Sequence, residues 1–181
     1  MPTAVSSAEL NRFAARYRLA NAFNEISING YPDNTVDAYS SVLRAFLAYS
    51  ALEQFHKAVP PTPNSREHIN SRWAHLATEH ASKLRRSKTI VLFLIKQVQN
   101  QTLRDGLTAF LGSKSDNCLF VATALRHAVA HGVMSVHPNG TSPKTAARFG
   151  NVLAQMLLQI ADQAFDDFFV SLDSNAYDRQ S

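Results

Sequence analysis

Three breaks rich in glycine, proline and asparagine divide the chain into long segments with helical patterning. The breaks lie at residues 29–34, 60–65 and 137–143. Between them, apolar residues recur three to four positions apart, which places them on one face of a helix. No segment alternates apolar and polar residues as a half-buried strand does. The sequence therefore predicts an all-α fold, in the form of a helical bundle.

The same patterning predicts seven helices. Their approximate ranges are 7–24, 35–58, 65–85, 88–100, 102–111, 116–131 and 143–172. Because the helix over 35–58 is apolar nearly all round, we expect it at the centre of the bundle. The helix over 65–85 carries many basic residues and histidines, so we expect it on the outside. Its histidines, together with His56, are expected to be solvated or to cap helix ends.

Several predicted helix ends carry recognisable signals. Ser6 and Glu9 have the spacing of a capping box at the start of the first helix. Asp116 is a favourable N-cap for the helix that ends near Gly132, and glycine is the residue preferred just after a helix end. Pro143 suits the first turn of the last helix. Asp116 and Gly132 therefore set the expected limits of the helix over 116–131.

The composition is that of a single globular domain over residues 1–181. Apolar residues make up 45% and charged residues 18%, so the chain can bury a core without disulfides or a metal. Cys118 is the single cysteine, which favours a reducing compartment. Residues 1–7 lack an apolar signal segment, and the longest apolar run, 90–95, is too short to span a bilayer. We therefore expect a cytoplasmic protein with no membrane contact.

One short segment carries three side chains of types that take part in catalysis. Arg126, His127 and His131 lie together near the end of the predicted helix over 116–131. Arginine binds phosphate oxygens through two N–H groups at once, and histidine transfers protons near neutral pH. The formal net charge of +4 permits an anionic partner without requiring one. The segment therefore favours chemistry at a phosphate group.

The run Leu125–Gly132 resembles the motif of HEPN domains (higher eukaryotes and prokaryotes nucleotide-binding). In that family an arginine is followed by a polar residue, and a histidine follows four to six residues after the arginine. Here four residues separate Arg126 from His131, and His127 occupies the polar position. The segment 48–53 is similar to the family's early helix, where an acidic residue can face the motif. The resemblance covers about residues 35–172 and implies a HEPN-like helical bundle.

The resemblance implies a metal-independent endoribonuclease without a cofactor, in which two subunits form one composite site. Arg126 would hold the scissile phosphate of the RNA, and His131 would act as general base or acid. His127 would orient His131, bind phosphate or supply the second proton transfer, and Glu53 would pair with Arg126. The products would be a 2′,3′-cyclic phosphate and a 5′-OH end. Such a homodimer would be a toxin or defence effector, with an antitoxin protein as its partner.

Three alternatives stay open at this point. The first alternative is a non-catalytic module of the same fold that binds RNA or another protein. It is raised by Val133, because some HEPN relatives carry an aromatic residue at this position. His127 and His131 have the spacing of two zinc ligands, although no third ligand or general base lies nearby in the sequence. Cys118 paired with His131 would be a nucleophile. His137 follows in the loop and has no assigned role.

The positions on the helix create a geometric difficulty. Residues five apart on an ideal helix point about 140° from each other. Arg126 and His131 of one subunit therefore do not share a face squarely. Three ways to bring them together stay open: the long arginine side chain reaches around the helix, a second subunit completes the site, or the helix breaks at Gly132. The basic cluster over 83–88 has two interpretations: a surface that follows an RNA backbone, or a helix C-terminus enriched in cations, which is favourable in itself. The second is slightly favoured.

Overall fold

The computed structural model describes residues 6–59 and 73–177, and within these ranges the chain is helical with no β-strand. The helices are α1 (Ser7–Ala22), α2 (Asp33–Ala58), α4 (Ala74–Arg85), α5 (Lys88–Gln97), α6 (Gln101–Leu111), α7 (Leu119–Ala130) and α8 (Pro143–Tyr177), with a short 3-10 turn over Pro138–Gly140. The all-α prediction is confirmed. The first part of the predicted helix over 65–85 lies outside the described residues.

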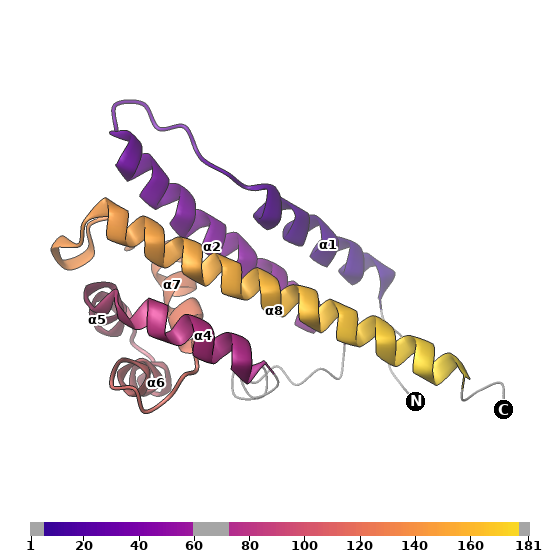
Figure 1. Cartoon of the computed structure of the whole chain (residues 1–181). Coiled ribbons are helices and arrows are strands. Elements are labelled where there is room, and N and C mark those ends of the chain that lie inside the picture. The colour runs from indigo at the N-terminus through magenta and orange to yellow at the C-terminus, as the bar shows by residue number, and fades with distance from the viewer. Residues whose placement is uncertain (1–5, 60–72, 178–181) are drawn as a thin grey trace.

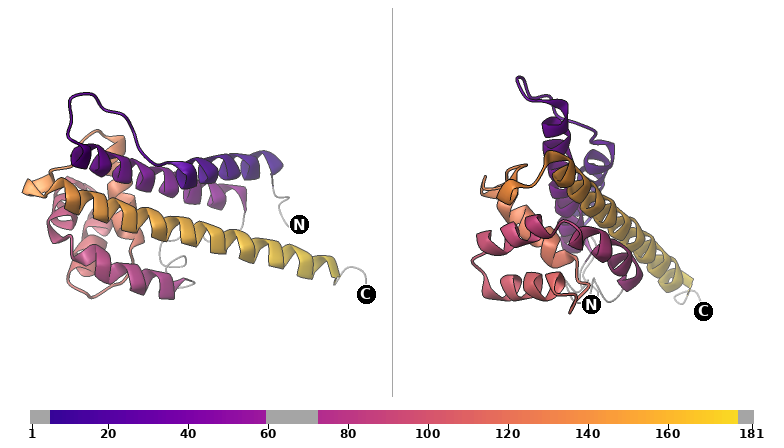
Figure 2. Two further views of the ribbon diagram at one scale, coloured as in Figure 1. Left: turned by 45° about the horizontal axis from the view of Figure 1, so that its top comes forward. Right: turned by 60° about the vertical axis from the view of Figure 1, so that its left-hand side comes forward.

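The long helices form one group and the short helices another. Figure 1 shows α2 and α8 side by side and running in the same direction, with α1 antiparallel to both. The shorter helices α4 to α7 pack beneath them, as the two views of Figure 2 show. The helix α2 contacts α1, α7 and α8, so the prediction that it lies at the centre is confirmed. This central position lets α2 hold α7 in place.

The helices α2 and α8 approach closely because small residues line their contact. A Cβ atom added at Gly150 of α8 would lie 2.6 Å from the carbonyl carbon of Ser41 on α2. Only a glycine therefore permits this separation of the two backbones. Further along, Phe13 of α1 packs against Phe55 of α2 and Phe165 of α8, at ring-centroid distances of 5.2 Å and 5.6 Å. These contacts close the core between the three long helices.

Arg85 joins the short helices to one another. Its guanidinium donates to the carbonyl of Phe110 at 2.7 Å and to that of Ser115 at 2.6 Å, and it also binds the Asp116 carboxylate. The prediction that Asp116 caps the next helix is therefore wrong. Helix α7 begins at Leu119, whose N–H instead donates to Oδ1 of Asn117 at 3.1 Å.

Two other local expectations are also wrong. No side-chain capping bond forms at Ser6, and the Glu9 carboxylate instead accepts hydrogen bonds from Arg12 and from Gln54 on α2. His56 and His80 are buried, with 8% and 1% of their surface exposed, rather than solvated. His75 is exposed as expected, and His68 lies outside the described residues. Across residues 6–59 and 73–177, no helix has the length and apolar character needed to cross a membrane.

Candidate functional site

Two polar contacts from α2 position the site-bearing helix α7. The Tyr49 hydroxyl lies 3.1 Å from Oγ1 of Thr123, and Oε2 of Glu53 lies 3.9 Å from Nε of Arg126. Residues three or four apart lie on the same face of a helix, so each helix presents one polar pair to the other. Glu53 therefore lies beside Arg126, as the resemblance to HEPN domains implies. Both side chains remain more than one-third exposed, so this ion pair lies at the solvent edge.

A glycine fixes the end of α7. Gly132 has a φ of +66°, a left-handed conformation that other residues rarely adopt. Its N–H donates to the carbonyl of Val129 at 3.0 Å, and the N–H of Val133 donates to that of Ala128 at 3.0 Å. This pair of bonds is the Schellman motif, so the prediction that the helix ends at Gly132 is confirmed. The motif fixes His131 as the C-cap residue, directly after Ala130, the last residue of the helix.

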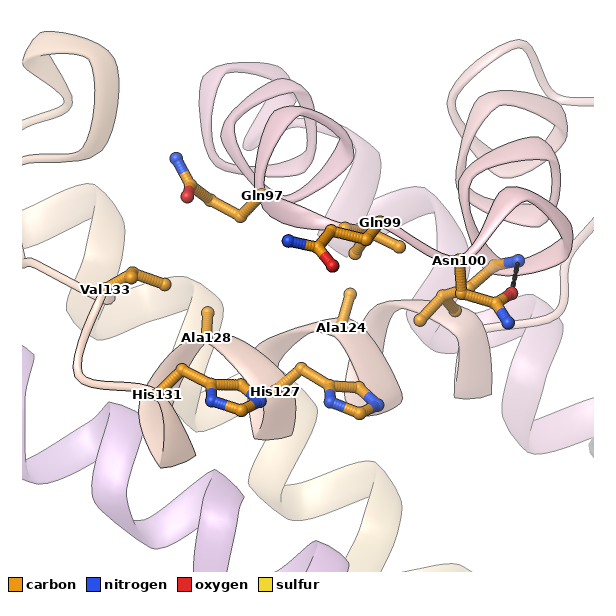
Figure 3. Close-up of a pocket in the computed structure, with 10 residues that line it drawn as sticks. Gln97, Gln99, Asn100, Ala124, His127, Ala128, His131 and Val133 are labelled. Carbon is orange, nitrogen blue, oxygen red and sulfur yellow. Dashed lines mark hydrogen bonds between the residues drawn. The ribbon is translucent and has the colours of Figure 1, made fainter.

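His127 and His131 lie one turn apart and form a pair. Their ring centroids are 6.1 Å apart, and the planes differ by only 4°. Figure 3 shows the two rings side by side in the same orientation. Both residues are exposed, although the preceding part of α7 is buried. The end of α7 therefore presents two imidazoles to solvent.

Arg126 does not join the histidine pair within one chain. It lies about 140° around the helix from His131, and its guanidinium faces Glu53 on α2. The cavity bordered by the two histidines does not include Arg126. The sequence-predicted residues are therefore divided into an Arg126–Glu53 pair on one side of α7 and a His127–His131 pair on the other.

A cavity of about 530 Å³ adjoins the histidine pair, between α7 and the connection from α5 to α6. It is lined by Gln97, Val98, Gln99, Asn100, Leu103, Ala124, His127, Ala128, His131 and Val133. None of these residues is a lysine, arginine, aspartate or glutamate. Sequence reasoning missed the three amide side chains, although the run of amides within residues 97–101 is a signal that could have found them.

Two of the alternative chemistries find no support in the described residues. Cys118 is fully buried, and this burial raises the pKa of its thiol to about 12, so it is unsuited to act as a nucleophile. In residues 6–59 and 73–177, no three histidine, cysteine, aspartate or glutamate side chains cluster as metal ligands. His137 is exposed in the loop after α7.

No protein-family model, curated protein or solved structure matches the chain. The resemblance to HEPN domains therefore depends on the motif itself and on where its residues lie.

Proposed function

We propose that the protein is a metal-independent endoribonuclease of HEPN type that acts as a homodimer. One observation carries the proposal: the three motif residues Arg126, His127 and His131 all reach solvent at the end of α7, while most of the rest of that helix is buried. A permanent cation and two imidazoles in one exposed turn and a half are the groups that RNA cleavage requires.

The reaction follows from the chemistry of these groups. Arg126 binds the scissile phosphate and stabilises the negative charge that grows on its oxygens. The imidazole of His131 takes the proton of the ribose 2′-OH, and the 2′-oxygen then forms a bond to phosphorus. The bond from phosphorus to the 5′-oxygen breaks, and a second imidazole gives that oxygen a proton. The products are a 2′,3′-cyclic phosphate and a 5′-OH end.

The dimer resolves the divergence of Arg126 and His131 on one helix. In a two-fold symmetric dimer the same surface patch of each copy meets its counterpart. An interface at the end of α7 therefore brings Arg126 of one copy toward His131 of the second copy. Glu53 holds the guanidinium of Arg126 on the side of α7 that faces α2, and the 3.9 Å separation places its carboxylate within reach for this role.

The proposal extends to the setting in which such an enzyme acts. The resemblance to HEPN nucleases favours a toxin or defence effector in the cytoplasm, held inactive by an antitoxin protein. A chain with one buried cysteine needs no oxidising compartment for its stability.

The test is RNA cleavage in the presence of EDTA. We expect wild-type protein to cut mixed single-stranded RNA, and Arg126→Ala and His131→Ala to lower the rate by about 10³-fold. Arg86→Ala and His75→Ala are matched controls, because these residues are exposed and lie on or beside α4. End-group analysis identifies the 2′,3′-cyclic phosphate. Cleavage that survives in both motif variants would exclude these residues from the mechanism.

A non-catalytic RNA-binding module is the second candidate. The separation of Arg126 from the histidine pair within one chain favours it, as does Val133 in place of an aromatic residue. Such a module binds RNA in a salt-dependent manner and releases no product. A cyclic phosphate product that disappears in His131→Ala would contradict it.

A further inference from the structure

The cavity beside the histidine pair has a lining unlike that of a phosphate site. Apart from the two imidazoles, the ten lining residues are amides and aliphatic side chains, with no permanent charge. A phosphate group is bound most effectively by arginine, lysine or a row of backbone N–H groups. A cavity with this lining instead suits a neutral ligand that has flat apolar faces and polar edges.

The three amide side chains of the cavity lie on one wall. Gln97 ends α5, and Gln99 and Asn100 follow it in the connection to α6. Figure 3 shows Gln99 across the cavity from Ala124 and Ala128 of α7. The side chains of Gln97 and Gln99 are exposed, and within the described residues neither has a hydrogen-bond partner. Both amides are therefore available to a ligand.

Asn100 differs from the two glutamines because the fold already uses it. Its Oδ1 accepts a hydrogen bond from the N–H of Leu103 at 2.9 Å and caps α6. Its oxygen is therefore partly engaged, whereas the amides of Gln97 and Gln99 are not used in this way. A side-chain amide that is fully available can both donate and accept, which is the pattern needed to bind the N7 and N6 edge of adenine.

The opposite wall is suited to the face of a base. Ala124 and Ala128 are small, so a planar ring can approach the backbone of α7, and His127 and His131 offer parallel imidazole rings. Proteins bind the unpaired bases of RNA by stacking on aromatic rings and by hydrogen bonds to the base edges. The volume of about 530 Å³ lies within the usual range of small-ligand sites.

We infer that this cavity binds an unpaired base of the RNA substrate, with adenine preferred, next to the phosphate that is cut. The inference rests on the proposed function, because His131 borders the cavity and would also act on the neighbouring ribose. Gln97 and Gln99 determine the base preference, and the alanines of α7 allow the ring to enter. The enzyme therefore cuts single-stranded RNA beside adenine.

The test combines a binding measurement with cleavage mapping. Adenosine, guanosine, cytidine and uridine are each titrated into the full-length protein, and the imidazole resonances of His127 and His131 are followed by NMR. We expect adenosine to bind most tightly and the double variant Gln97→Ala/Gln99→Ala to weaken it about 10-fold. Gln155→Ala, an exposed glutamine of α8 outside the cavity, is the matched control and leaves binding unchanged.

The outcomes separate this inference from the proposed function. If none of the four nucleosides shifts the imidazole resonances, the base site is overturned even where RNA is cut. Cleavage that shows no base preference and does not change in the double variant overturns it as well, and leaves the nuclease intact. Adenosine binding that depends on the two glutamines, without any RNA cleavage, supports the base site and contradicts the nuclease.

Discussion

The buried framework, meaning the packed core between the helices, and the exposed end of α7 differ in how much space surrounds their residues. Where α2 meets α8, Gly150 and Ser41 bring two backbones so close that a single added carbon atom has no space. At the end of α7, His127, His131 and Gly132 are exposed, and a Cβ at Gly132 would meet nothing within 4 Å. Steric contact restricts which side chains the first region can hold, whereas the second region has room for a ligand.

This difference indicates which residues determine the stability of the fold and which determine its chemistry. Substitutions in the framework change the packing of long helices and lower the free energy of unfolding. Substitutions of exposed side chains at the end of α7 remove few contacts and change that free energy little. Variants of the two regions should therefore separate folding from activity.

The largest expected contrast concerns Cys118, which lies just before α7 and is fully buried. Burial raises the pKa of its thiol from 9.0 to about 12. Iodoacetamide reacts with the thiolate, so at pH 9 we expect native protein to be alkylated at least about 10³-fold more slowly than unfolded protein. Mass spectrometry of timed samples measures this ratio. Equal rates in both states would show that the start of α7 is not part of the framework.

The same thiol predicts a dependence of stability on alkaline pH. The folded-state pKa is higher than that of the unfolded chain, so the contribution of Cys118 is fully present below about pH 9 and decreases as the pH rises toward 12. Denaturant unfolding of wild type and Cys118→Ala at several pH values isolates the contribution of the thiol. If the unfolding free energies of the two proteins change in parallel with pH, the raised pKa of Cys118 is contradicted.

Gly150→Ala should be the most damaging single-carbon change in the contact between α2 and α8. The new methyl group overlaps the backbone of Ser41 as well as its Oγ, and we expect a loss of about 2–3 kcal/mol in unfolding free energy. Urea unfolding measures it. Asn151→Ala, at the exposed neighbouring position, should stay within about 0.5 kcal/mol of wild type. Equal stability of the two variants would refute the close approach of the helices.

Gly132→Ala tests the boundary between the two regions. A residue with a Cβ at a φ of +66° lowers the free energy of unfolding by about 1 kcal/mol. The strained residue directly follows His131. We expect this loss in thermal unfolding, together with slower RNA cleavage. Gly132→Asn is the matched variant, because asparagine tolerates the left-handed conformation, and it should recover most of both quantities. Full activity in Gly132→Ala would mean that the Schellman motif does not position the histidine.

Glu53→Gln should have the smallest effect on stability. An ion pair at 3.9 Å between side chains more than one-third exposed contributes less than about 0.5 kcal/mol. Cleavage should nevertheless slow, because the orientation of Arg126 is lost. Glu79→Gln removes the exposed pair with Lys83 on α4 and serves as the control, with activity unchanged. If both variants cut RNA at the wild-type rate, Glu53 does not position Arg126.

The helices could be predicted from the sequence because their signals are local. Apolar spacing, Pro143 and Gly132 each act within one or two turns of the residues concerned, and the observed helices follow the expected ranges closely. The two errors in helix capping arose from distant partners. Asp116 is bound by Arg85, and Glu9 is bound by Gln54, so neither carboxylate is available to cap a helix.

The candidate site was only half predictable for the same reason. The motif that contains Arg126 and His131 lies within six residues, so its place at the end of a helix follows from the sequence. The other wall of the cavity comes from Gln97 and Gln99, and only the packing of α5 and α6 against α7 brings these residues to His127.

The most direct measurement for the central claim is a subunit-mixing experiment. Arg126→Ala and His131→Ala are each expected to be inactive alone. When the two are mixed and allowed to exchange subunits, a mixed dimer holds one site with an intact Arg126 from one copy and an intact His131 from the other. If the site is composite, RNA cleavage in EDTA returns on mixing, to a substantial fraction of the wild-type rate. A mixture that exchanges subunits and stays inactive would contradict the composite site.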